Sequence, residues 1–185
     1  CLVGSEMCIR DREAPGSLRL DNHARAARLS YLLWNTTPNE ALLRAADEGK
    51  LTDPAQLAAI AQKMVRSPRL EDGVRAFFAD MLLFEKFDEM AKDQIVYPRF
   101  NPDVASALSE QMLRMIVDQL VTRQGDYRDL FTTRRTFINR ALGPLYQAKV
   151  SSMQGWVPYE FADGDDRAGL LGQAGFLALY SHSGR

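Results

Sequence analysis

Four segments of the chain carry the pattern that starts an α-helix, and this pattern limits the fold more than any other feature. In each, a proline follows a residue whose side-chain oxygen can cap a helix: Thr37-Pro38, Asp53-Pro54, Ser67-Pro68 and Asn101-Pro102. Proline suits the first helical position because its φ angle is already helical and its missing N–H would lack a partner there. Thr37 and Asp53 also have Glu40 and Gln56 three residues later, which completes a capping box. The sequence therefore predicts a helix starting at each of these prolines.

The hydrophobic spacing between these starts is helical as well. Apolar residues recur at intervals of three and four, as on the buried face of an amphipathic helix. HARAARLSYLLW, His23 to Trp34, predicts a further helix. Gly49 and Gly125 stand where a residue at positive φ would end a helix at little cost. The predicted core-facing stripes are Leu57, Ile60, Ala61 and Met64; Val74, Phe77, Phe78, Met81 and Leu82; and Val104, Leu108, Met112, Met115, Ile116 and Leu120.

The C-terminal third has weaker helical signals. Short helices are predicted for DYRDLF, capped by Asp126, for TFINRALGPLYQ, interrupted at Gly143, and for RAGLLGQAGFLALYS. Between the last two, residues 156–161 form a short extended run followed by an acidic turn. The predicted fold is therefore mainly α, a helical bundle-like array with a small irregular or β-hairpin segment near 150–165.

Composition and charge narrow the possible partners. The 185 residues are 46% hydrophobic and 25% charged, as in ordinary globular domains, and 23 Lys and Arg balance 24 Asp and Glu. A formal net charge of -1 provides no positive field for phosphates, so no nucleic-acid partner is expected. No apolar run approaches the roughly 18 to 20 residues that cross a bilayer, so no membrane span is expected. Charged residues interrupt the N-terminal segment, and no signal peptide is visible.

The first twelve residues, CLVGSEMCIRDR, contain both cysteines of the chain, Cys1 and Cys8. Their spacing matches neither C-x-x-C nor C-x-x-C-H, and no nearby His completes a zinc site. The segment lacks helical patterning and resembles a translated sequencing adapter. We therefore expect residues 1–23 to be a non-native or disordered segment, with Leu2, Val3 and Ile9 outside the core. The native part of the chain is then expected to be free of cysteine.

Candidate site residues lie mainly near the C-terminus. His182 stands between two serines, and Arg167 follows the acidic run of Asp163, Asp165 and Asp166. His182, Arg167 and Asp166 are the candidate catalytic residues, although no G-x-S-x-G elbow precedes His182 and the acidic run lacks the terminal Glu of a calcium loop. The alternative roles are a surface histidine and a solvated turn. A pocket lined by these residues would favour catalysis over scaffolding. No metal or cofactor site is assigned to this chain.

Two further groups have a functional and a structural interpretation. Arg134, Arg135 and Arg140 in TRRTFINR could bind a carboxylate or phosphate, whereas surface ion pairs with Asp126 and Asp129 are the commoner outcome. Met64, Met81, Met112 and Met115 could ligate a haem iron, but their helical spacing favours packing in the core. His23 near the start of the first helix has no metal-ligand partner nearby in the sequence and is expected at the surface.

Several segments resemble a family of bacterial domains of unknown function, typical of large planctomycete-type proteins that also carry a cytochrome c domain. The matching elements of the first module are Ala27-Arg28-Leu29-Ser30-Tyr31 with Leu33-Trp34, the Pro38 turn, Leu42-Leu43, Gly49-Lys50-Leu51 and Met64 to Pro68. RAFFADMLLFEKFD, YPRFNPDVASALSEQM and the stretch from Asp129 through TFINRALGPLYQ resemble a neighbouring module. RAGLLGQAGFLALYSHSGR resembles the start of a third.

This resemblance covers residues 24–185 and implies an interior fragment of a longer protein. It implies modules at 24–70 and 71–164, with a truncated third at 165–185. The implied setting is periplasmic or otherwise extracytoplasmic, with the cytochrome c domain of the same full-length chain as partner. Haem c would lie on that missing domain, and an enzyme built this way would be an oxidoreductase of unknown substrate. The alternative is a non-catalytic binding or scaffolding module of a secreted bacterial protein.

Overall fold

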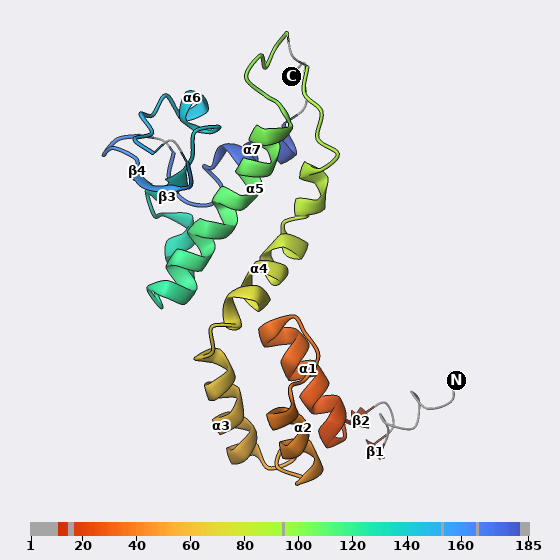
Figure 1. The fold of residues 1–185 in the computed structure, drawn as a ribbon. Helices are drawn as coiled ribbons and strands as arrows, with labels where there is room; N and C mark the ends of the chain where they lie inside the picture. Colours follow the sequence, from red (N-terminus) through yellow and green to blue (C-terminus); the bar gives the residue numbers. More distant parts are fainter. Residues whose placement is uncertain (1–10, 15–16, 94, 153, 166, 182–185) are drawn as a thin grey trace. The chain divides into compact units, whose positions relative to one another are not determined.

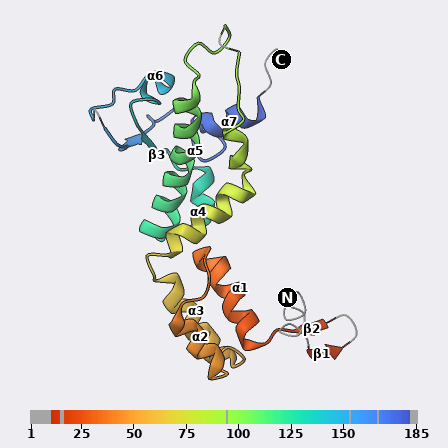
Figure 2. The same ribbon diagram turned by 45° about the vertical axis from the view of Figure 1, so that its right-hand side comes forward.

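The computed structural model describes residues 11–14, 17–93, 95–152, 154–165 and 167–181, and divides into two compact units between Phe77 and Phe78. Figures 1 and 2 show the elements of both units along the chain. Each unit has its own interior and is described separately below. The predictions for Leu2, Val3 and Ile9 lie outside the described residues.

The first unit is built on three helices. A hairpin of β1 (Asp11–Ala14) and β2 (Ser17–Arg19) precedes α1 (Asn22–Trp34), α2 (Glu40–Asp47) and α3 (Pro54–Val65). Helices α2 and α3 each pack against α1. The predicted stripe of α3 faces this core with Met64 buried and Leu57 and Ile60 partly buried. The buried core residues are Ala26, Trp34, Leu42, Ala46, Leu51 and Met64.

The ends of these helices confirm two predictions and correct one. Asp53 caps α3 by accepting from the backbone N–H of Ala55, and Gly49 adopts a φ of 73° after α2. Helix α2, however, begins at Glu40 rather than Pro38, because Asn39 is its cap and accepts from the N–H of Leu42 at 2.9 Å. The predicted capping box on Thr37 is therefore wrong. Asn ranks above Thr as an N-cap, and the helix starts two residues later than predicted.

Helix α4 (Leu70–Met81) begins two residues after Pro68, and Ser67 caps the preceding turn by accepting from the N–H of Arg69. Its predicted stripe is only half correct. Phe78 and Leu82 are buried, but the side chains of Phe77 and Met81 are 55% and 49% exposed. Met81 is thus not a core methionine, whereas Met64, Met112 and Met115 are buried as expected.

The second unit surrounds the long helix α5 (Pro102–Val117), which begins at Pro102 under an Asn101 cap as predicted. Five of the six residues in its predicted stripe are buried, from Val104 to Ile116. Strand β3, helix α7 and the 3-10 helix η1 all contact it. The other elements are η1 (Phe84–Phe87), the π-turn η2 (Asp118–Thr122), the 3-10 helix η3 (Tyr127–Phe131), β3 (Arg135–Ile138), α6 (Gly143–Tyr146), β4 (Val157–Glu160) and α7 (Ala174–Tyr180).

Two local predictions in this unit are wrong. After η2 the residue at positive φ is Gln124, at 51°, and not Gly125. The segment around TFIN forms strand β3 and not a helix, because Thr136 and Ile138 alternate inward with a period of two. Strand β3 pairs antiparallel with β4, Arg135 opposite Glu160 and Ile138 opposite Val157. Asp126 caps η3 as predicted, and only the end of RAGLLGQAGFLALYS is helical.

The predicted fold class is confirmed, since the described residues form a mainly α chain with small antiparallel strand pairs. The extended run near 157–160 exists, but its partner comes from residues 135–138 rather than from an adjacent hairpin. Within the described part of the chain, no helix is both long and apolar enough to cross a membrane.

Candidate functional site

A cleft of about 660 Å³ opens in the second unit between α5, α7 and residues 88–93 and 95–101, which we call the strap. Such a volume lies within the range of about 300 to 1,000 Å³ typical of small-molecule sites. Most of its lining is apolar: Val96, Tyr97, Pro98, Phe100, Val104, Leu108, Leu145, Ala174, Leu177 and Ala178, with Lys92, Arg99 and Ser181 at its edges. The cleft is therefore suited to an apolar molecule.

The position of α7 along α5 sets one wall of the cleft. Figures 1 and 2 show α7 lying beside α5. Gly175 makes this approach possible, because a Cβ there would lie 2.7 Å from Met112 Sδ and 3.1 Å from the carbonyl oxygen of Leu108. On either side of this glycine, Ala174 and Ala178 present small side chains to the cleft. Larger side chains at these two positions would fill the cleft, so the alanines leave it open.

Two cations attach the strap to the rest of the unit. Lys92 Nζ donates to the carbonyl oxygens of Ala178 (2.7 Å) and Ser181 (2.9 Å) and to Ser181 Oγ (3.2 Å). A positive charge is favourable there because the C-terminus of a helix has unpaired carbonyls and a partial negative charge. Arg99 Nη1 donates to the carbonyl oxygen of Pro144 at 2.5 Å. The strap wall is consequently held near both its ends.

A second, more polar cleft of about 480 Å³ shares Arg99, Val104 and Leu145 with the first. Arg140 and Asp103 add a cation and an anion to its lining, beside Asn101 and Pro144. Among the described residues, Arg140 makes no hydrogen bond or ion pair. The apolar cleft therefore adjoins a region with two guanidinium groups and one carboxylate.

A buried polar network adjoins the apolar cleft through Ala174. The Tyr146 hydroxyl donates to Gln111 Oε1 at 2.8 Å and accepts from the backbone N–H of Ala174 at 3.0 Å. Gln173 Oε1 accepts from Thr136 Oγ1 at 3.2 Å, and its Nε2 donates to the carbonyl oxygen of Gly169 at 3.3 Å. Gln111 and Gln173 are fully buried. These bonds join α5, β3, α6 and the start of α7.

Burial controls the chemistry of this network. It raises the pKa of the Tyr146 hydroxyl, against smaller opposing effects from its bonds to Ala174 and Gln111. Tyr146 is therefore a neutral hydrogen-bond donor at physiological pH. Gln111 Nε2 has no partner among the described residues, and an unpaired buried N–H costs free energy or is satisfied by water.

Of the three candidate catalytic residues predicted from the sequence, the structure describes one, Arg167. Arg167 lies over the Tyr146 ring, with its guanidinium carbon 5.4 Å from the ring centroid, a cation–π contact at the edge of the buried network. His182 and Asp166 lie outside the described residues, so their proposed association with Arg167 stays a prediction. The strap and the cleft were not predicted, because their residues carry no sequence motif and meet only in the folded unit.

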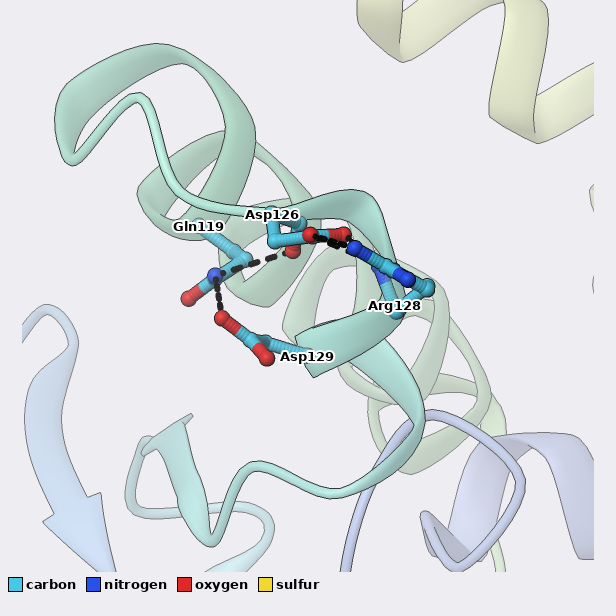
Figure 3. Close-up of polar contacts among 4 residues, drawn as sticks. All are labelled: Gln119, Asp126, Arg128 and Asp129. Atoms are coloured by element: carbon cyan, nitrogen blue, oxygen red, sulfur yellow. Dashed lines mark hydrogen bonds and ion pairs between the residues drawn. The ribbon is translucent and has the colours of Figure 1, made fainter.

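The arginine cluster of TRRTFINR separates in the structure. Arg134 pairs with Asp163, and Arg140 lines the polar cleft. Asp126 instead binds Arg128 through both carboxylate oxygens, and Gln119 Nε2 donates to Asp129 Oδ2 and to the carbonyl oxygen of Asp126, as Figure 3 shows. The hydrogen bond from Arg128 lowers the pKa of Asp126. This polar cluster fastens η2 to η3 and is structural.

The first unit has a groove of about 580 Å³ between α2 and α3, floored by Trp34, Leu42 and Met64. The Trp34 indole N–H donates to the carbonyl oxygen of Met64 at 3.1 Å. His23 is at the surface as expected, with Nε2 3.0 Å from Asp47 Oδ1. Among the described residues no group of three or more His, Cys, Asp or Glu side chains is arranged to hold a metal ion.

Comparison with known proteins gives one match. The sequence profile of a family described as a protein of unknown function (DUF1592, PSD4) matches residues 20–148 and so spans parts of both compact units. No curated protein and no solved structure matches the chain. Because the match covers more than half of the 185 residues, the chain belongs to the DUF1592 family.

Proposed function

We propose that the second unit is a non-catalytic binding module and that its cleft between α5, α7 and the strap binds an apolar small molecule. The observation that carries this proposal is the cleft itself, about 660 Å³ with a mainly apolar lining. A ligand there would cover apolar surface now open to water, which is favourable in proportion to the area covered.

The cleft is held open by features that do not depend on a ligand. Lys92 and Arg99 attach the strap by hydrogen bonds to carbonyl oxygens, and Gly175 allows α7 to lie close against α5. A preformed site is an advantage for affinity because less ordering is needed on binding. The module therefore binds without a large rearrangement of these elements.

A neutral fluorescent probe, N-phenyl-1-naphthylamine, tests this proposal on the 185-residue protein. Saturable fluorescence enhancement is expected, and Ala178→Phe should abolish it by filling the cleft. Ala162→Phe adds the same ring at an exposed position outside the cleft and should leave binding intact. Absence of saturable binding, or binding that Ala178→Phe leaves unchanged, would contradict the proposal.

We further propose that this module works within a larger extracytoplasmic protein and supports redox chemistry or electron transfer by a cytochrome c domain. The support is the resemblance of residues 24–185 to cytochrome c-associated planctomycete-type proteins. The residues of this chain do not fit a covalent haem c site, since it contains no C-x-x-C-H. The module's role would be to bind the substrate or scaffold the haem domain.

The full-length protein, haem domain included, provides the test. If the module serves the redox reaction, Ala178→Phe should slow haem reduction by substrate, whereas Ala162→Phe should not. Equal rates in both variants would contradict substrate binding by the cleft in the redox reaction, while leaving ligand binding by the cleft as a separate result.

A further inference from the structure

Resting on the proposed binding role of the cleft, we infer that its ligand is an amphipathic organic anion, an alkyl or aryl body with one carboxylate. The geometry behind this inference is the adjacency of the two clefts. Arg99, Val104 and Leu145 line both, so the region beside Arg99 and Arg140 adjoins the space between α5 and α7 where an apolar body would lie.

The cations in this region differ in their availability. Lys92 donates to three oxygens at the end of α7, which uses all the donors of its ammonium group. Arg99 donates one of its five N–H groups to the carbonyl oxygen of Pro144, and Arg140 donates none to the described residues. Arg99 and Arg140 therefore have free donors for a planar anion, and Lys92 does not.

The charge balance also favours an anion. Asp103 is the carboxylate that lines the polar cleft against the two guanidinium groups. The N-terminus of α5, whose cap Asn101 belongs to the same lining, adds a partial positive charge. Arginine binds carboxylates through paired N–H donors, whereas Asp103 would repel a second anionic group placed near it. One carboxylate at one end of an apolar body matches this arrangement.

Titration calorimetry with dodecanoate and with dodecanol tests the inference on the same chain. Dodecanoate should bind more tightly, and its affinity should fall as NaCl rises from about 0.01 to 1 M, over which the Debye length falls from about 30 to 3 Å. Arg140→Gln should weaken dodecanoate by about 3- to 10-fold, the range expected for an exposed charge-assisted contact, and leave dodecanol unchanged. Arg135→Gln, an exposed arginine of β3 outside both clefts, is the matched control.

The outcomes separate the two proposals. If dodecanol and dodecanoate bind equally, without dependence on salt or on Arg140, the anion inference is wrong and binding by the cleft stands. If neither binds, binding by the cleft fails as well. Selective loss of dodecanoate binding in Arg140→Gln, but not in Arg135→Gln, confirms the inference.

Discussion

The two units bury different kinds of interior. In the first, α2 and α3 pack on α1 around Trp34, Leu42, Leu51 and Met64, and the buried polar side chain among its described residues is that of Ser30. In the second, Gln111, Thr136 and Gln173 are buried together with the Tyr146 hydroxyl. Apolar side chains can fill a core in many packing arrangements, whereas the hydrogen bonds of a buried polar network can all form in only a few.

The two units also differ in the groups that their long-range hydrogen bonds join. In the first unit the Trp34 indole N–H donates to a backbone carbonyl oxygen, that of Met64, 30 residues away. In the network, Tyr146 and Gln111 are 35 residues apart, and Thr136 and Gln173 are 37 apart. The second unit thus depends on buried side chains that pair with one another only when distant segments meet.

The largest expected effect comes from removing a core leucine from each unit. Leu51→Ala and Leu130→Ala each truncate a fully buried side chain and should cost about 2 to 5 kcal/mol of unfolding free energy. Each unit contains one tryptophan, Trp34 or Trp156, so urea unfolding followed in Trp156→Phe and Trp34→Phe backgrounds reports each unit separately. A loss below about 1 kcal/mol for either leucine would contradict the assigned cores.

A smaller effect is expected from the network alone. Tyr146→Phe leaves Gln111 Oε1 and the Ala174 N–H without their partner and should destabilise the second unit by about 1 to 3 kcal/mol. Denaturant unfolding followed by Trp156 fluorescence measures this loss. Tyr127→Phe, at an exposed tyrosine of η3, should change the stability little. Equal stability of the two variants would mean that the network contributes nothing.

The raised pKa of Tyr146 gives the same network a pH signature. Above about pH 10 the unfolded chain loses the tyrosine proton, while the folded unit retains it until a higher pH. The stability that this group contributes is therefore present below about pH 10 and is lost as the pH rises toward the folded pKa. Unfolding free energies at alkaline pH should fall less steeply in Tyr146→Phe, and identical slopes would oppose the assignment.

The cap of α2 is a local test in the first unit. Asn39→Ala should cost about 1 kcal/mol, since it removes the acceptor for the N–H of Leu42. Thr37→Ala should be nearly neutral, because the helix begins after Asn39. The two unfolding midpoints, followed by Trp34 fluorescence, decide between the caps. The opposite ranking would restore Thr37 as the cap.

The smallest effect concerns the polar cluster around η3. The pKa of Asp126 is held below its usual value by the Arg128 guanidinium, so the pair stabilises the unit above about pH 4 and this contribution is lost as the pH falls through the lowered pKa. Arg128→Gln should raise the pKa of Asp126 in an NMR titration of the carboxyl carbon. An unchanged pKa would show that Arg128 does not act on it.

The sequence predicted what short-range chemistry determines. The Asp53 and Asn101 caps and the stripe of α5 follow from residues within a few turns, and the structure confirms them. Strand β3 was missed because its partner, β4, begins about twenty residues further on and its four residues also fit a helix. The cleft was missed because Arg99, Arg140 and Ala178 carry no shared motif and meet only through the packing of α5, α6 and α7. Asn39 shows that even a local signal is ambiguous when two residues that can cap a helix, here Thr37 and Asn39, lie two positions apart.

An amide NMR titration of the 185-residue protein with dodecanol tests the central claim, that the second unit is the one built to bind. Chemical shifts should change for Val96, Leu108 and Leu177, which line its cleft, and stay constant for Ala41, Ala59 and Ile60, which line the groove of the first unit. Saturable changes confined to the first groove, or no saturable changes in either, would contradict it.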